Sequence, residues 1–104
     1  MFTVFYHPKA EQEANELPIA IRAKYDKLVK KLEQDPRLLR EPDTKPLGNG
    51  LFELRTQGND IARALWIYKK ANRIIMLRIF IKKSQKISRA EIDLAWARLE
   101  EITL

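Results

Sequence analysis

The chain has 104 residues, 45% of them hydrophobic and 33% charged, which suffices for one compact domain, residues 1–104, and not for two. Its 3 Gly and 5 Pro exclude collagen-like and low-complexity chains. With no Cys and 1 His the chain lacks disulfides, thiolate chemistry and the usual metal ligands, so we expect neither metal nor cofactor. Because no apolar run reaches the roughly 18 residues of a membrane helix, and no signal-peptide layout is present, we expect a cytoplasmic protein without membrane contact.

The net charge of +6 is concentrated in one part of the chain. Residues 60–89 carry nine basic side chains and one acidic one, whereas residues 1–35 are neutral and residues 90–104 are acidic. A basic region on a small domain is typical of proteins that bind nucleic acid phosphates. A solvated surface that maintains solubility is the alternative interpretation.

The first third of the sequence predicts one strand and two helices. Residues 2–6 are aromatic and β-branched and predict a strand that ends at His7-Pro8. A helix is expected over residues 9–16, and a second one begins at Pro18 and ends before Asp35-Pro36. The apolar positions of the second helix form one stripe: Ile21, Tyr25, Leu28, Val29 and Leu32.

The remainder predicts a loop, three strands and a helix. Prolines and glycines between residues 36 and 50 indicate a connecting loop. The strands are Leu51–Gln57, Asp60–Lys70 and Arg73–Lys83, separated by turns at Gly58-Asn59 and Ala71-Asn72. Ser88 caps a final helix, whose apolar stripe is Ile92, Ala95, Trp96, Leu99 and Ile102. The order βααβββα predicts an α+β domain with an antiparallel meander, two N-terminal helices on one face and a C-terminal helix.

Alternation along the strands predicts which side chains share a face. With Ala71-Asn72 as a two-residue turn, Lys70 opposes Arg73 and Arg63 opposes Phe80. One extra residue at Gly58-Asn59 keeps the Arg55 guanidinium out of the core. The core below the N-terminal helices would then contain Ala62, Ala64, Trp66, Ile75, Leu77, Ile79 and Ile81. The opposite, open face would carry Glu53, Arg55, Arg63, Arg78 and Lys82, with Ile67, Ile74 and Met76 near the last helix. Cations gathered in this way suit an anionic ligand, although pairing with acidic neighbours is the alternative.

Three segments resemble a known family. They are Lys45-Pro-Leu-Gly-Asn-Gly-Leu-Phe-Glu-Leu-Arg55, then Arg63 in the next strand, then Phe80-Ile-Lys-Lys-Ser-Gln-Lys86 before a helix. Together with the element order, they resemble the RelE/ParE toxin superfamily in its phage-derived HigB-type branch. The resemblance implies a RelE-like fold and the toxin of a type II toxin-antitoxin system. Such a toxin is typically an mRNA interferase, an endoribonuclease that cuts mRNA on the ribosome and inhibits translation. The implied partners are the ribosome, mRNA and a helix-turn-helix, HigA-like antitoxin, through which a hetero-oligomer binds operator DNA.

The resemblance also assigns roles to individual residues. Arg55, Arg63, Lys82 and Lys83 would belong to the catalytic set, to which the position of Glu53 close to Arg55 adds that carboxylate as an alternative base. RNA-binding residues would be Lys45, Gln85 and Lys86, and the predicted open face adds Arg78 to them. A Tyr or His near the C-terminus of many relatives has no counterpart after Tyr68, and His7 is expected to be a turn residue beside Pro8.

Cleavage of RNA without metal needs cations for the phosphorane charge and groups that carry protons to and from ribose oxygens. Arginines suit the first task because a guanidinium binds two phosphate oxygens and stays charged. Lysine crowded by cations, or Glu53, could serve as base, although a carboxylate paired with arginine is a weak one. A ParE-like gyrase inhibitor and a non-catalytic RNA-binding or adaptor protein are the alternatives. Retention of four cationic positions counts against the first: Lys45, Arg55, Arg63 and the Lys82-Lys83 pair.

Overall fold

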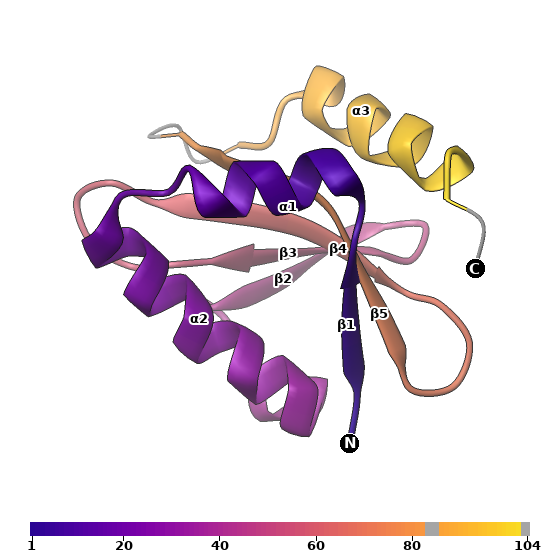
Figure 1. The fold of residues 1–104 in the computed structure, drawn as a ribbon, viewed down its shortest axis with the longest axis horizontal. Helices are drawn as coiled ribbons and strands as arrows, with labels where there is room; N and C mark the ends of the chain where they lie inside the picture. Colours follow the sequence, from indigo (N-terminus) through magenta and orange to yellow (C-terminus); the bar gives the residue numbers. More distant parts are fainter. Residues whose placement is uncertain (83–85, 103–104) are drawn as a thin grey trace.

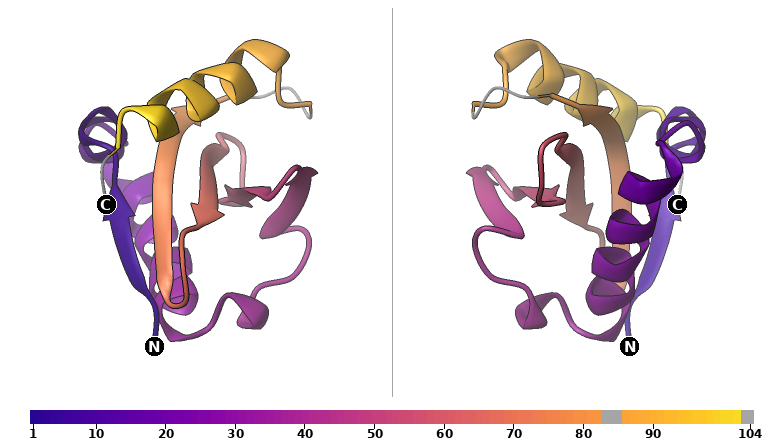
Figure 2. Two further views of the ribbon diagram at one scale, coloured as in Figure 1. Left: turned by 90° about the vertical axis from the view of Figure 1, so that its right-hand side faces the viewer. Right: turned by 90° about the vertical axis from the view of Figure 1, so that its left-hand side faces the viewer.

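The computed structural model describes residues 1–82 and 86–102. Its elements are β1 (Thr3–Tyr6), α1 (Pro8–Asn15), α2 (Ile19–Gln34), the 3-10 helix η1 (Pro36–Leu38), β2 (Thr44–Gly48), β3 (Leu51–Arg55), β4 (Ala62–Tyr68), β5 (Arg73–Ile81) and α3 (Arg89–Glu100). The strands form one sheet in the order β1-β5-β4-β3-β2, with β1 parallel to β5 and the other neighbours antiparallel. Helices α1 and α2 cover one face and α3 covers part of the other (Figure 1, Figure 2), which confirms the predicted α+β architecture.

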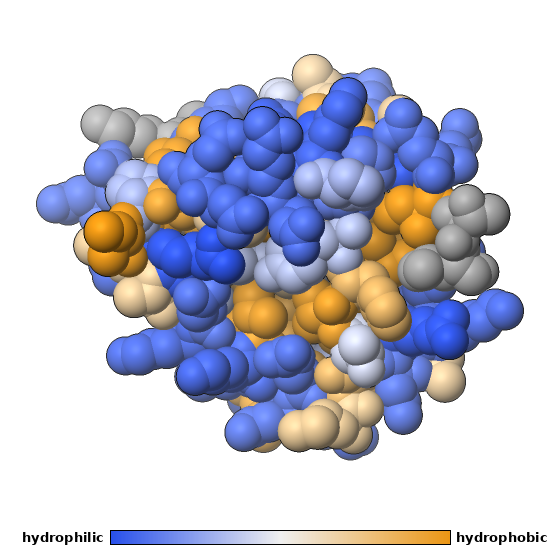
Figure 3. Space-filling model, viewed as in Figure 1, coloured by the Kyte–Doolittle hydropathy of each residue, from blue (hydrophilic) through white to orange (hydrophobic). Residues whose placement is uncertain are grey.

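The two N-terminal helices begin and pack as the sequence indicates. Nδ1 of His7 accepts a hydrogen bond of 3.0 Å from the Lys9 N–H and so caps α1, while Pro8 occupies the first position, where an N–H has no helical partner. The buried side of α2 is formed by Tyr25, Leu28 and Leu32. Hydrophilic residues cover most of the outer surface of both helices, with apolar atoms visible between them (Figure 3).

An apolar core lies on each face of the sheet. The sheet residues below α1 and α2 are Leu54, Ala62, Ala64, Trp66, Ile74, Met76 and Ile79. Those below α3 are Leu51, Leu65, Ile67, Ile75, Leu77 and Phe80, which pack with Ala95 and the other apolar residues of α3. Every residue of β4 except Tyr68 is buried, because both faces of this central strand are covered. Any charged residue in β4 must therefore find partners inside the protein.

The hairpin between β4 and β5 differs from the expected two-residue turn. Lys69, not Lys70, lies opposite Arg73, and its N–H donates to the Arg73 carbonyl at 2.8 Å. The loop thus has three residues, and Lys70 and Ala71 adopt left-handed φ angles of 52° and 23°. The prediction failed because neither residue carries the glycine signal that normally marks such a loop.

This one-residue difference reverses the faces of the first half of β5. Ile74 and Met76 pack below α1 and α2 rather than near the last helix, and Ile75 and Leu77 pack below α3 rather than below the N-terminal helices. A β-bulge at Leu77 then restores the expected register, because Trp66 pairs with Met76 whereas Leu65 pairs with Arg78. From there to the end of β5 the predicted pairing is confirmed, including Arg63 opposite Phe80.

The predicted register of β3 against β4 is confirmed. Arg55 lies opposite Arg63 and Glu53 opposite Leu65, so Glu53, Arg55 and Arg63 share the face that α3 partly covers. A strict two-residue turn would have shifted the pairing by one residue and placed Arg55 on the other side. The cost of burying a guanidinium without a partner was therefore a correct guide to the register.

The region expected to be only a loop contains a strand. Thr44–Gly48 forms β2 at the edge of the sheet and pairs with β3, with Lys45 opposite Glu53. Pro46 is compatible with this strand because an edge strand leaves one row of its N–H groups unpaired. The interpretation of the prolines and glycines as loop signals was wrong here for that reason.

In the part of the chain that the structure describes, no helix is long and apolar enough to span a membrane.

Candidate functional site

Three of the predicted catalytic residues form one buried ion cluster, the Glu53 trio of Glu53, Arg55 and Arg63. Nη1 of Arg63 donates to Oε2 of Glu53 at 2.9 Å, and Nε of Arg55 lies 3.2 Å from Oε1. Glu53 and Arg55 share a face because they are two residues apart in β3, and Arg63 joins them through its pairing with Arg55. The adjacent strands thus bring the three side chains together.

The members of the Glu53 trio differ in exposure. The side chains of Arg63 and Glu53 are 1% and 2% exposed, whereas that of Arg55 is 20% exposed. Nε of Arg55 also donates to the Pro42 carbonyl at 3.1 Å, which holds the guanidinium at the edge of the cluster. Two positive charges against one negative charge leave the trio with a net charge of +1. Arg55 is the member that presents this charge to solvent.

Both carboxylate oxygens of Glu53 interact with guanidinium groups, Oε1 with Arg55 and Oε2 with Arg63. These two charge-assisted contacts hold the Glu53 carboxylate in place inside the protein. The geometry therefore favours Glu53 as the group that positions the two arginines.

The predicted lysines come from the edge strand β2 and from the segment after β5. Lys45 is exposed in β2, directly opposite Glu53. Lys82 is half-buried immediately after β5, and its N–H donates to the Ile61 carbonyl at 3.2 Å. Lys86 is exposed. The other two predicted residues of this segment, Lys83 and Gln85, lie outside the described residues.

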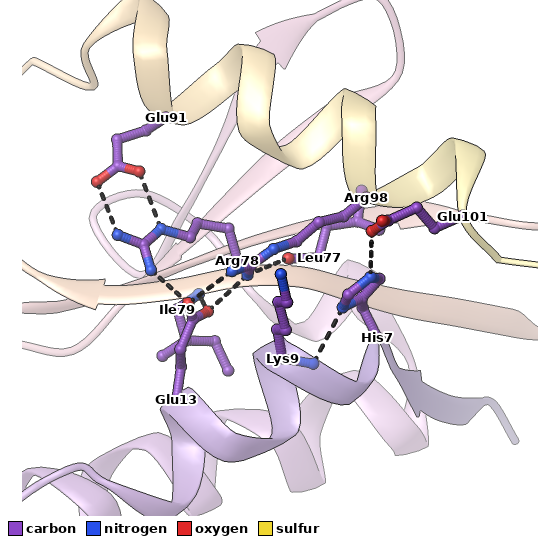
Figure 4. Close-up of polar contacts among 9 residues, drawn as sticks. All are labelled: His7, Lys9, Glu13, Leu77, Arg78, Ile79, Glu91, Arg98 and Glu101. Atoms are coloured by element: carbon purple, nitrogen blue, oxygen red, sulfur yellow. Dashed lines mark hydrogen bonds and ion pairs between the residues drawn. The ribbon is translucent and has the colours of Figure 1, made fainter.

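Arg78 lies on the same face of the sheet but is not an open cation. Its guanidinium contacts the Glu13 carboxylate and donates from Nε to Oε1 of Glu91 at 2.9 Å (Figure 4). Its carbon Cζ also lies 5.1 Å from the centre of the Phe80 ring. Burial lowers the pKa of Arg78, but hydrogen bonds and charge from Glu91 and Glu13 outweigh it and raise that pKa above its usual value. The expectation of Arg78 as part of an exposed basic face therefore differs from the structure.

A second ion cluster, the Glu13 cluster of Glu13, Arg78, Glu91 and Arg98, joins α1, β5 and α3 (Figure 4). Sequence reasoning missed it. Arg98 donates to both oxygens of Glu13 at 2.8 and 2.9 Å and also to the carbonyl of Leu77 at 2.9 Å. Glu13 accepts in addition from the Ile79 N–H at 3.0 Å.

These backbone contacts explain why charged residues lie between the helices and the sheet. Leu77 is the extra residue of the bulge in β5, so its carbonyl lacks a regular ladder partner, and β1 ends before it reaches Ile79. Arg98 and Glu13 supply the missing partners. Burial raises the pKa of Glu13, but the hydrogen bonds from Arg98 and Ile79 and the charge of Arg78 outweigh burial and hold the pKa below its usual value. The signal in the sequence was a charge at a core-facing helical position, Glu13 beside Ala14 and Arg98 three residues after Ala95.

The single histidine has a structural position, as expected. His7 is buried, and its Nε2 lies 2.7 Å from Oε1 of Glu101 while Nδ1 caps α1 (Figure 4). Because Nδ1 accepts a hydrogen bond, the proton of the neutral ring is on Nε2, which donates to Glu101. Within residues 1–82 and 86–102, no group of three or more His, Cys, Asp and Glu side chains is arranged to hold a metal ion.

A groove of about 460 Å³ adjoins the exposed side of Arg55. It lies between α2 and the segment that follows β3. The residues that line it are Lys24, Lys27, Leu28, Lys31, Asp43, Arg55, Thr56, Gln57 and Gly58. The candidate site therefore has a buried part, the Glu53 trio, and an open basic part that begins at Arg55.

Comparison with solved structures shows which fold this is. The isolated RelE toxin of E. coli superposes with a TM-score of 0.63 over 95% of this chain and 99% of that one, at 12% identity. The RelBE2 toxin-antitoxin complex of Mycobacterium tuberculosis matches with a TM-score of 0.59 at 23% identity, covering 78% of this chain and 98% of that one. The archaeal RelE-RelB complex of Pyrococcus horikoshii matches with a TM-score of 0.51 at 18% identity, covering 75% of this chain and 91% of that one.

Comparison of sequences gives one family. No curated protein matches the chain significantly. The family model described as "Phage derived protein Gp49-like (DUF891)" matches residues 12–100. This range includes α2, the whole meander and α3, and thus both ion clusters. The chain therefore belongs to the phage-derived Gp49-like family, and its fold is that of the RelE toxins.

Proposed function

We propose that this protein is the toxin of a type II toxin-antitoxin system and acts in the cytoplasm as a ribosome-dependent mRNA endonuclease. The observation that carries the proposal is the Glu53 trio, because it fixes two arginines by one buried carboxylate and leaves a net positive charge at the surface through Arg55. Lys45 lies opposite Glu53 on the neighbouring strand, and Lys82 follows β5, where its N–H pairs with the Ile61 carbonyl just before β4. Membership of the Gp49-like family and the RelE fold support this assignment.

In the reaction proposed, a ribose 2′-hydroxyl gives its proton to a base and its oxygen attacks the adjacent phosphorus. The new oxygen–phosphorus bond closes a 2′,3′-cyclic phosphate, the bond to the 5′-oxygen breaks, and that oxygen takes a proton. Arg55 would bind the phosphate oxygens as negative charge accumulates on them, since a planar guanidinium matches two such oxygens. Arg63 would act behind it by neutralising Glu53, so that the charge of Arg55 remains available to the phosphate.

The proton carriers proposed are the lysines after β5. Lys82 is the described member, and Lys83 belongs to the same motif. With Glu53 engaged by two arginines and His7 engaged in capping α1, neither is assigned to proton transfer. A site without a dedicated base depends strongly on the orientation of its substrate, which can account for several kcal/mol of a barrier. An mRNA held on the ribosome supplies that orientation, and this is why we propose ribosome dependence.

The partner proposed is an antitoxin, as in the solved RelBE2 and RelE-RelB complexes that share this fold. For this chain we propose a helix-turn-helix, HigA-like protein, which would bind operator DNA and carry the toxin with it. The antitoxin segment that contacts the toxin is proposed to be acidic, because the site presents the exposed Lys45 and the partly exposed Arg55.

The test is primer extension on mRNA in a reconstituted translation reaction, with and without ribosomes. Arg63→Ala is a poor probe, because it leaves Glu53 buried with one fewer cation and endangers folding. Arg55→Ala is better, because the Arg55 side chain is partly exposed, and Arg40→Ala is the matched control on an exposed arginine. We expect ribosome-dependent cuts by wild type and by the Arg40 variant, and a loss of cutting of at least about 100-fold in the Arg55 variant. Toxicity without cuts would contradict the nuclease assignment.

A second candidate function is RNA binding without cleavage. One observation favours it, namely that Arg63 is 1% exposed and therefore cannot contact a phosphate without rearrangement. Under this alternative, Arg55→Ala would weaken RNA binding, and wild type would leave mRNA intact in the same assay.

A further inference from the structure

The groove beside Arg55 has one wall made by a single face of α2. Lys24, Lys27 and Lys31 occur at i, i+3 and i+7, which places them in one row along a helix. Leu28, buried between them, forms part of the floor. The side chains of all three lysines are therefore directed to one side of the helix, toward the segment that follows β3.

The opposite wall is connected to this row. Nζ of Lys24 donates to the Gln57 carbonyl at 2.8 Å, and the Gln57 side-chain amide donates to the Pro42 carbonyl at 3.3 Å. Gly58 follows with a φ of +125°, and a Cβ at this position would lie 2.8 Å from the Lys24 Nζ. The Lys24 side chain is therefore fixed to the opposite wall, whereas Lys27 and Lys31 line the groove without such a bond in the described part of the chain.

The groove is strongly basic. Its lining has four cations, Lys24, Lys27, Lys31 and Arg55, and one carboxylate, Asp43, which gives a net charge of +3. In the described part of the chain, neither Lys27 nor Lys31 forms a salt bridge, although Arg22 and Asp26 of the same helix pair with each other at 2.9 Å. A row of like charges with only one carboxylate beside it is unfavourable by itself and is relieved by an anionic ligand.

Arg55 belongs both to this groove and to the Glu53 trio, so the two are continuous. We propose that the groove binds the phosphodiester backbone of an RNA strand, with Lys27 and Lys31 each contacting a phosphate beyond the one at Arg55. The assignment of RNA rests on the proposed function. The two lysines are one helical turn apart, a rise of about 6 Å along the axis, so they meet separate phosphates rather than sharing one. An acidic protein segment fits less well, because the lining offers no aromatic or exposed aliphatic anchor for a protein hot spot.

The experiment compares two double variants of equal charge. Lys27→Glu with Lys31→Glu alters the groove, and Lys9→Glu with Lys30→Glu alters exposed lysines outside it. Both proteins are first checked for an unchanged circular dichroism spectrum and melting temperature. Binding is measured by fluorescence anisotropy to a 2′-O-methyl oligouridine of roughly 12 nucleotides, which cannot be cleaved because it lacks the 2′-hydroxyl. A second arm measures cosedimentation with whole ribosomes.

We expect the groove variant to bind at least about tenfold more weakly than the control variant near 0.1 M salt. Loss of two phosphate contacts should also reduce the slope of log affinity against log salt by about 1.4 relative to wild type. If the groove variant loses affinity for the oligouridine, the RNA bound in the groove is the substrate strand. If it loses affinity only for ribosomes, the RNA bound there is ribosomal RNA. Equal binding of the two variants in both arms overturns the proposal. Competition by oligoglutamate but not by RNA overturns it in favour of an acidic protein segment.

This outcome is separate from that of the nuclease test. If the groove variant binds RNA more weakly but wild type never cuts mRNA, the RNA-binding groove is supported and the nuclease assignment is contradicted. If wild type cuts mRNA on the ribosome but both variants bind RNA equally, the nuclease assignment is supported and the RNA-binding groove is contradicted.

Discussion

Replacement of Glu13 by glutamine should test what holds the C-terminal helix to the sheet. Glu13 accepts two hydrogen bonds from Arg98, one from the Ile79 N–H, and contacts Arg78. Glutamine retains one acceptor oxygen but turns an NH₂ group toward these donors and removes the negative charge. Arg98 would remain almost entirely buried, with a side chain 7% exposed and no carboxylate partner in Glu13.

The expected loss in the free energy of unfolding is about 3 kcal/mol at pH 7. Breaking a buried ion pair from one side costs about 3–5 kcal/mol, and the lower end applies because the Glu13 side chain is 19% exposed. Glu11→Gln is the matched control in the same helix, since Glu11 is exposed, and it should change stability by less than about 0.5 kcal/mol. Urea unfolding with a common m-value measures both. A Glu13→Gln loss no larger than that of the control would refute the role of the cluster.

The same variant has a signature in its pH dependence. Because the pKa of Glu13 is held below its usual value of 4.5, ionised Glu13 stabilises the folded protein above that pH, and this stability is lost as the pH falls through the lowered folded-state pKa. The difference between wild type and Glu13→Gln should therefore be constant near neutral pH and decrease below about pH 4.5. A difference that stays constant down to pH 3 would show that shape, and not charge, accounts for the loss.

Three further changes should have measurable effects. His7→Ala removes the cap of α1 and should lower the free energy of unfolding by about 1–2 kcal/mol in urea; an unchanged midpoint would contradict the capping role. Tyr25→Phe removes the 2.8 Å hydrogen bond to the Tyr6 hydroxyl, at about 1 kcal/mol. Because burial raises the pKa of Tyr25, wild type should lose stability as the pH rises above 10, and this variant should lose less. The same dependence of stability on pH in both proteins would contradict this expectation. Gly58→Ala places a Cβ at a φ of +125°, next to Lys24, and should lower stability by about 1–3 kcal/mol; an unaltered thermal melt would contradict that strain.

The residues of the candidate site were largely predictable, whereas their environments were not. Alternation along β3 and the cost of burying Arg55 placed Glu53, Arg55 and Arg63 on one face, and the structure confirms this. Their ordering by exposure depends on how far α3 and the neighbouring strands cover that face, which is a property of packing between segments far apart in the chain. The same kind of packing explains why the expectation of an exposed Arg78 was wrong. Glu13 and Glu91, from two different helices, neutralise its charge.

The sequence alone determined the helices, the order of the meander strands and the pairing at Arg63, because these depend on local periodicity, capping and the alternation of side chains. It did not determine the β4–β5 loop, since Lys70 and Ala71 take left-handed conformations without a glycine to signal them. Only the tertiary structure decided the bulge at Leu77 and the charged residues that bind its backbone. A residue that leaves the ladder must find hydrogen-bond partners elsewhere, and here they come from helices at opposite ends of the chain, where no local pattern could reveal them.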